Sequence, residues 1–149
     1  MPKKKKRVIT RIILASDHAG FHLKENIKKF LIKKRKNILD LGTKNTHPVD
    51  YPDFAHLLSK KMKKNNKQIG ILVCGSGIGM DMTANKHKNI RSALCNNIKS
   101  AKLSREHNNA NVISFGAQLI EKKLALKCVN IFINTNFMGG RHLRRVKKI

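Results

Sequence analysis

The residues with the clearest potential for chemistry form one short loop, Cys74-Gly75-Ser76-Gly77-Ile78-Gly79. An apolar run leads directly into the thiol, and glycines then alternate with a hydroxyl and an apolar residue. This pattern is typical of a buried strand that ends in a tight loop whose backbone N–H groups point inward. Such a loop can hold a negative charge without a cationic side chain. We therefore expect the floor of an active site that handles an anionic intermediate.

Cys74 itself has two interpretations. A cysteine that ends an apolar run is usually a buried, inert thiol. At the start of a glycine-rich loop and a helix, however, its pKa should fall, which favours the thiolate. The glycines favour the reactive interpretation. The loop is not a Walker motif, because no lysine follows the last glycine, and it lacks the context of a dinucleotide fingerprint, which belongs on the first strand.

Two further residues of interest, Asp17 and His18, follow the first apolar run. Asp17 could cap a helix, and His18 could be a surface residue. Alternatively, both belong to the site. His18 and His22 are spaced like a zinc pair, but no third ligand is evident, so we expect no metal site.

Three basic residues in the last third of the chain are further candidates. His107 is placed to be a capping cation at a helix end, which is the more common role. Arg141 and Arg145 are four residues apart. They belong either to a basic surface or to one helix face that clamps a phosphate.

These residues must be positioned by strands that alternate with helices. Short apolar runs predict five strands, and residues at helical spacing follow each of them. This order implies a doubly wound parallel sheet covered on both faces. Ligands in such folds bind beyond the carboxyl ends of the strands. The expected strands are residues 12–15, 38–41, 69–73, 92–95 and 112–115.

The length and composition set the outer limits of the prediction. The chain has 149 residues, enough for one domain, which we place at residues 11–149 behind a basic and flexible tail at residues 1–10. The tail resembles a nuclear-localisation signal, but a disordered basic segment is the preferred interpretation. Cys74, Cys95 and Cys128 have neither metal nor redox spacing, so a reducing, cytoplasmic location is expected, with the latter two structural. No apolar run reaches membrane-spanning length.

The formal net charge of +25 raises the possibility of a nucleic-acid-binding protein. The lysines are spread over several expected helix faces, and aromatic residues for base stacking are scarce, with no Trp and one Tyr. We therefore expect nucleic acid to bind only non-specifically. Phosphorylated small molecules would also gain from the positive field.

Taken together, several segments resemble those of the ribose-5-phosphate isomerase type B family, within the ribose/galactose isomerase superfamily. The resemblance covers residues 11–149, nearly the whole chain. Each segment alone is a weak signal, but their order is highly specific. They are SDHAGFHLKENI, DYPDF, CGSGIGM, ANK, IRSALC, SREHNNANV and GGRHLRRVKKI.

This resemblance implies a Rossmann-like three-layer α/β/α sandwich with a five-stranded parallel sheet. It also implies an aldose–ketose isomerase that interconverts ribose 5-phosphate and ribulose 5-phosphate without a metal or organic cofactor. Allose-6-phosphate and galactose-6-phosphate isomerases of the superfamily are the alternatives. The assembly would be a homodimer or homotetramer with active sites shared between subunits.

The resemblance also implies roles for individual residues. Cys74 would be the general base, Ser76 would move protons between substrate oxygens, and backbone N–H groups of Gly75, Gly77, Ile78 and Gly79 would stabilise an enediolate. Asp17 and His107 would assist opening of the sugar ring. The residues that would bind phosphate or sugar are His18, Tyr51, Asn108, Arg141 and Arg145.

Two positions depart from the pattern of the family. Some members have a glutamate base just after the loop, where this chain has Met80, so the base should be Cys74. Some members have an arginine where this chain has Gln118, which removes one expected phosphate contact.

Overall fold

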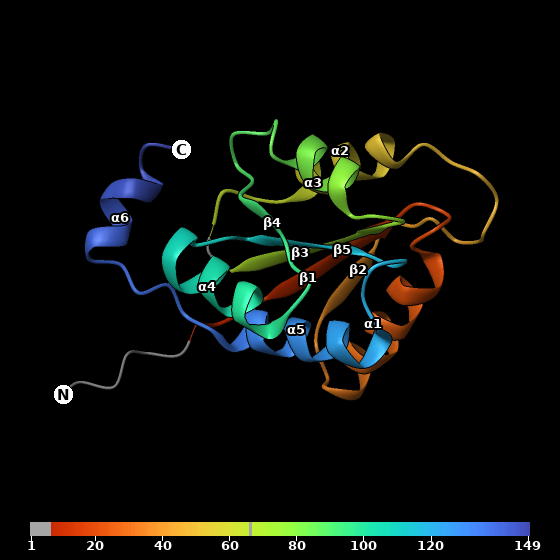
Figure 1. The fold of residues 1–149 in the computed structure, drawn as a ribbon, viewed down its shortest axis with the longest axis horizontal. Coiled ribbons are helices and arrows are strands. Elements are labelled where there is room, and N and C mark those ends of the chain that lie inside the picture. The colour runs from red at the N-terminus through yellow and green to blue at the C-terminus, as the bar shows by residue number, and fades with distance from the viewer. Residues whose placement is uncertain (1–6, 66) are drawn as a thin grey trace.

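The protein is a five-stranded parallel sheet between two layers of helices, described here from a computed structural model that covers residues 7–65 and 67–149. The strand order is β2-β1-β3-β5-β4 (Figure 1). The strands are β1 (Arg11–Ser16), β2 (Ile38–Asp40), β3 (Gln68–Cys74), β4 (Ser92–Leu94) and β5 (Val112–Gly116).

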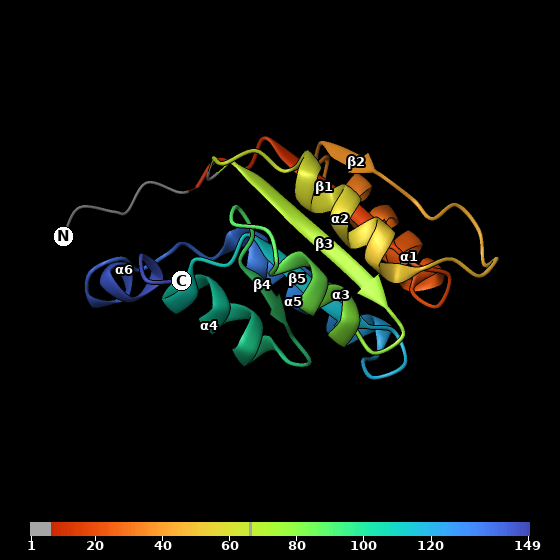
Figure 2. The same cartoon turned by 90° about the horizontal axis from the view of Figure 1, so that it is seen from above.

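Helices cover both faces of this sheet. Helices α1 (Phe21–Lys33), α4 (Ile98–Asn108) and α5 (Lys122–Asn134) pack on one face, and α2 (Tyr51–Lys61) and α3 (Ile78–Ala84) pack on the other (Figure 1). The last helix, α6 (Arg141–Val146), contacts α4 and extends past the amino ends of the strands (Figure 2). The predicted Rossmann-like three-layer fold is therefore confirmed.

The central strands are buried because both of their faces contribute to a core. In β1, Ile12 and Leu14 belong to the cluster beneath α1 and α5, whereas Ile13 and Ala15 belong to the cluster beneath α2 and α3. Successive side chains of a strand point to opposite faces, so a strand covered on both sides needs an unbroken apolar run. All seven residues of β3 are buried for the same reason.

Local sequence signals account for the ends of three helices. Helix α2 begins at Tyr51, because Pro52 fits the first helical turn, where its missing N–H is not needed. Helix α4 continues to Asn108 and ends where Asn109 adopts a left-handed conformation, with φ of 49°. The C-terminal segment forms the helix α6, which carries both Arg141 and Arg145.

The N-terminal segment is described only from Arg7 onward, so residues 1–6 of the predicted tail lie outside the described residues. The backbone N–H of Arg7 donates to Asn136 Oδ1 at 3.2 Å. The N–H of Thr10 donates to the carbonyl of Lys67 at 2.8 Å. The chain is thus tied to the domain before β1 begins.

Candidate active site

The candidate site lies where the direction of the sheet's winding reverses. The chain goes from β1 outward to β2 and then crosses back to β3 on the other side of β1. In open α/β sheets, ligands bind at the carboxyl ends of the two strands that flank such a switch point. Here those ends carry Asp17 and Cys74, and the N–H of Asp17 donates to the carbonyl of Val73 at 3.2 Å.

The loop after β3 is folded tightly around the sulfur of Cys74. The N–H of Gly77 donates to Cys74 Sγ at 3.1 Å. Gly77 has φ of 77°, and a Cβ at this residue would lie 2.7 Å from the backbone N of Gly116. A Cβ on Gly116 would in turn lie 2.3 Å from the carbonyl oxygen of Ser76. Both positions therefore require glycine, and Gly116 is a site residue that the sequence reasoning missed.

The expected fall in the pKa of Cys74 is wrong. Burial raises the pKa of this thiol, and the charge of Asp17 adds to the rise, although hydrogen bonds from the backbone N–H groups of Met80, Gly77 and Ser76 oppose it. The Cys74 side chain is only 4% exposed and packs in the apolar cluster beneath α2 and α3. The thiol is therefore protonated at neutral pH, and the loop amides are positioned to solvate the sulfur once the proton leaves.

Asp17 and His18 fix the neighbouring turns. Asp17 Oδ1 accepts the N–H of Gly20 at 2.9 Å. Gly20 is itself the residue that caps α1, so Asp17 closes the preceding turn and does not cap the helix. The N–H of Val49 donates to His18 Nδ1 at 3.1 Å, which ties the loop before α2 to the end of β1.

The loop before α2 leads to Tyr51, the first residue of α2, whose side chain packs against the glycine loop. The aromatic ring of Tyr51 lies so close to Gly79 that a Cβ there would be 2.5 Å from the ring. Ser76 Oγ accepts the N–H of Ile78 at 3.3 Å. The N–H of Gln118 donates to the carbonyl of Gly75 at 3.0 Å, and the neutral Gln118 side chain lies beside Gly75.

The remaining candidates lie at the opposite edge of the same sheet. His107 and Asn108 end α4, and Arg141 and Arg145 are on α6. The carboxyl end of β3 and helix α6 lie at opposite ends of the molecule (Figure 2). Since β5 starts opposite Gly70, four residues before the end of β3, the two edges are roughly 13 Å apart along the strands. One chain does not bring the two groups together.

Within this second group, the ring of His107 stacks on the ring of His142, with centroids 4.2 Å apart and an interplanar angle of 10°. His142 is buried. The stack joins the end of α4 to α6 and holds the arginine-bearing helix against the domain. Sequence reasoning assigned no role to His142, and only its place between the two arginines could have drawn attention to it.

The other candidate features of the sequence have structural explanations. Burial raises the pKa of Cys95 to about 11, and Cys128 is fully buried in the core. The ring of His22 packs edge-on against Phe21. Within residues 7–65 and 67–149, no group of three or more potential metal ligands is present. The helices of the same residues are too short or too polar to cross a membrane.

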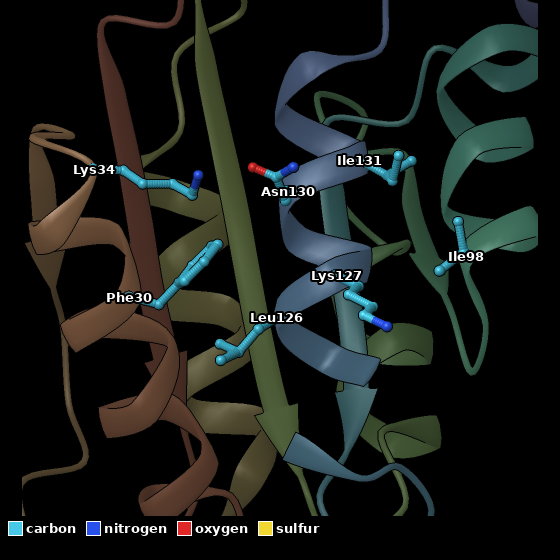
Figure 3. A pocket seen from close by; sticks show the side chains of 7 residues that line it. All are labelled: Phe30, Lys34, Ile98, Leu126, Lys127, Asn130 and Ile131. Carbon is cyan, nitrogen blue, oxygen red and sulfur yellow. The ribbon is translucent and has the colours of Figure 1, made fainter. Parts of the chain in front are cut away.

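A separate groove of 320 Å³ lies on the outer face of α5, between α1 and α4 (Figure 3). Phe30, Leu126 and Ile131 provide apolar surface there, and Lys34 and Lys127 lie beside it. None of the candidate site residues lines this groove.

The fold and the site define a class: a Rossmann-like α/β protein with a thiol and a glycine loop at the switch point of its sheet. The Ribose/Galactose Isomerase family matches residues 12–149, and the chain belongs to this family. A probable ribose-5-phosphate isomerase B from Mycoplasma genitalium is 45% identical over 140 residues, covering 93% of this chain and 92% of the relative.

Solved structures give the same result. Ribose-5-phosphate isomerase B from Mycoplasma genitalium, crystallised with bound ribulose-5-phosphate, has a TM-score of 0.89 at 44% identity, covering 93% of this chain and 92% of that one. The ribose 5-phosphate isomerase of Thermotoga maritima has a TM-score of 0.90 at 44% identity, and the match covers 93% of this chain and 96% of that one. The family identified from the sequence segments is thus confirmed.

Proposed function

We propose that the protein is an aldose–ketose isomerase that interconverts ribose 5-phosphate and ribulose 5-phosphate. The observation that carries the proposal is the position of Cys74 Sγ at the switch point, 3.1 Å from the N–H of Gly77 and beside Asp17. The family membership supports it, as does the relative that holds ribulose-5-phosphate.

In the proposed mechanism, the Cys74 thiolate removes the proton from C2 of the open-chain aldose. The C–H electron pair forms the C1–C2 double bond, and negative charge moves onto O1 to give an enediolate. The thiol then returns its proton to C1, and Ser76 carries a proton between O1 and O2, so that no atom is gained or lost. Backbone N–H donors aimed at a developing oxyanion typically contribute about 3 kcal/mol each.

The Gly77 N–H already donates to the sulfur in the free protein. We assign this donor to the thiolate and the N–H groups of Gly75, Ile78 and Gly79 to the enediolate. The Ile78 N–H donates to Ser76 Oγ at 3.3 Å in the free protein, so it would turn to the enediolate when Ser76 engages the substrate oxygens. The same loop would then stabilise both negative charges that the reaction creates. No step requires a metal or an organic cofactor, so dialysis against EDTA should leave the rate unchanged.

The complete site requires a second copy of the chain, because His107, Asn108, Arg141 and Arg145 lie at the far edge of their own sheet. In the proposed homodimer, or in a homotetramer built from such dimers, these residues of one copy face Cys74 of the other. His107 would assist Asp17 in opening the furanose ring. Asn108 would join Tyr51 at the sugar, and the arginines would join His18 at the phosphate. The phosphate would orient the reacting carbons from a distance.

The direct test measures ribulose 5-phosphate formation by the purified protein and by Cys74→Ala, with Cys95→Ala as the matched control. Cys74 is the last residue of β3 and Cys95 directly follows β4; both are buried, but Cys95 is not in the glycine loop. We expect a loss of at least 10²-fold for Cys74→Ala, the lower end for a positioned base, and near wild-type activity for Cys95→Ala. A fully active Cys74→Ala protein would remove the base assignment, and a wild type inactive on every sugar phosphate would remove the function.

The choice among sugars is a separate question within the same chemistry. Comparing kcat/KM for ribose 5-phosphate, allose 6-phosphate and galactose 6-phosphate decides it, and we expect the five-carbon substrate to be preferred. The three free, buried thiols fit a reducing, cytoplasmic setting.

A further inference from the structure

A polar cavity of 280 Å³, here called the amino-edge pocket, lies between the end of α2 and the segment that leads into β4. Its lining contains four cationic side chains and no carboxylate, together with asparagine amides. The cations are Lys63, Lys64, Lys88 and Arg91. No lining residue belongs to the candidate active site.

Hydrogen bonds of two asparagine amides, Asn89 and Asn111, fix the backbone around the pocket. Asn111 Oδ1 accepts the N–H of Arg91 at 2.8 Å, and Asn111 Nδ2 donates to the carbonyl of Asn89 at 2.8 Å. Asn89 Nδ2 donates to the carbonyls of Ser59 and Met62, each at 3.0 Å. These carbonyls end α2, and their partial negative charge would repel an anion if it were uncovered. The amide framework thus fixes the backbone from which the cationic side chains extend, and the three lysines among them are exposed to solvent.

Among residues 7–65 and 67–149, no carboxylate forms an ion pair with the cations of the pocket. The ion pairs found among the described residues involve Lys24, Lys28 and Lys102, none of which lines the pocket. Arg91 uses its Nε–H on the carbonyl of Asn109 at 3.0 Å, so its position is fixed without neutralising it.

Two further guanidinium groups lie near Arg91. Burial lowers the pKa of Arg105 to about 9, and the charges of Arg7 and Arg91 add to this effect. Burial and the charge of Arg91 lower the pKa of Arg7 to about 10. The three cations therefore repel one another at this edge of the sheet, and a bound anion would relieve that repulsion.

We propose that the amino-edge pocket binds the diphosphate group of a small phosphorylated molecule. Arginine matches phosphate oxygens with two parallel hydrogen bonds, and lysines supply point charges around them. The cavity volume is slightly below the range of about 300–1,000 Å³ for sites that enclose drug-sized ligands. A compact, highly charged group suits it better than a bulky one.

The experiment titrates the full-length protein with inorganic pyrophosphate by isothermal calorimetry at about 0.15 M NaCl. The test variant is K63E/K88E, and the milder K63Q/K88Q removes charge without reversing it. The control K29E/K123E makes the same change in net charge on exposed lysines outside the pocket. A fourth protein, R141A/R145A, separates this pocket from the proposed catalytic phosphate contacts.

We expect K63E/K88E to bind pyrophosphate at least tenfold more weakly than wild type, K63Q/K88Q to show a smaller loss, and K29E/K123E to change less than twofold. The isomerase rate of K63E/K88E should equal that of wild type. R141A/R145A should keep its affinity for pyrophosphate while losing isomerase activity, so that the two proposals fail independently.

Three results would overturn the inference. Equal weakening in K63E/K88E and K29E/K123E would show diffuse attraction to a basic protein. Loss of pyrophosphate binding in R141A/R145A would place the anion on α6. Unchanged pyrophosphate affinity in K63E/K88E, with weaker binding of a single-stranded oligonucleotide, would make this surface a nucleic-acid contact.

Discussion

The separation of the candidate residues within one chain leads to a prediction about mixtures of inactive variants. Cys74→Ala removes the proposed base at the carboxyl edge. R141A/R145A removes the proposed phosphate contacts on α6, at the other edge. If each site combines one edge from each of two copies, a heterodimer of these variants carries both defects in one site and none in the other.

The magnitude follows from this geometry. Random exchange of equal amounts gives a half share of heterodimers, and each has one intact site of its two, so activity should recover to about one quarter of wild type. If all site residues came from one chain, every site would stay defective, and activity would remain at the residual level of the parent variants.

The assay follows ribulose 5-phosphate formation after the two variants have been mixed under conditions that allow subunit exchange, with native mass spectrometry to quantify heterodimers. The matched control mixes Cys74→Ala with Asp17→Asn. Both changes lie at the same edge, so each heterodimer site has one defect and no rescue is expected. Heterodimers without recovered activity, or equal recovery in the control mixture, would refute the shared site.

Three further predictions concern single positions. Because burial raises the pKa of Cys74 and only the thiolate is a base, kcat/KM should rise about tenfold per pH unit between about pH 6 and 8; a flat profile in stopped-flow assays would contradict this. Gly116→Ala places a Cβ 2.3 Å from the Ser76 carbonyl oxygen and should lower kcat roughly 10²-fold by displacing the loop; wild-type kinetics would show that the loop tolerates the shift. Asp40→Asn should lower the free energy of unfolding in urea by about 3 kcal/mol, because Lys24, which is 1% exposed, loses its carboxylate partner at 2.9 Å. A loss below about 1 kcal/mol would show that Glu25 alone is enough to compensate the charge of Lys24.

The strands and the glycine loop could be predicted because their signals are local. Strands buried on both faces are continuous apolar runs, as in residues 69–73, and such runs leave few alternatives. The position of Cys74 at the carboxyl edge then followed from the alternation of strands and helices. Asp17 was placed beside it by the same rule.

What the sequence could not show depends on how distant segments pack. The apolar run before Cys74 allowed either a buried or a reactive thiol. The packing of Leu72 and of Met80 from α3 in the same cluster decides for burial, and that packing cannot be read from the local sequence. The direction of α6 is set by the stack of His107 on His142 and by the positive φ values of Gly139 and Gly140. Sequence similarity could name Arg141 and Arg145 as site residues, but it could not show that their own chain holds them at the opposite edge.

The protonated state of Cys74 has a consequence for the resting protein under oxidative conditions. Peroxide and alkylating agents react with the thiolate, and a buried thiol with a raised pKa presents little of it. The burial that keeps this thiol protonated at neutral pH therefore also protects the sulfur from irreversible oxidation.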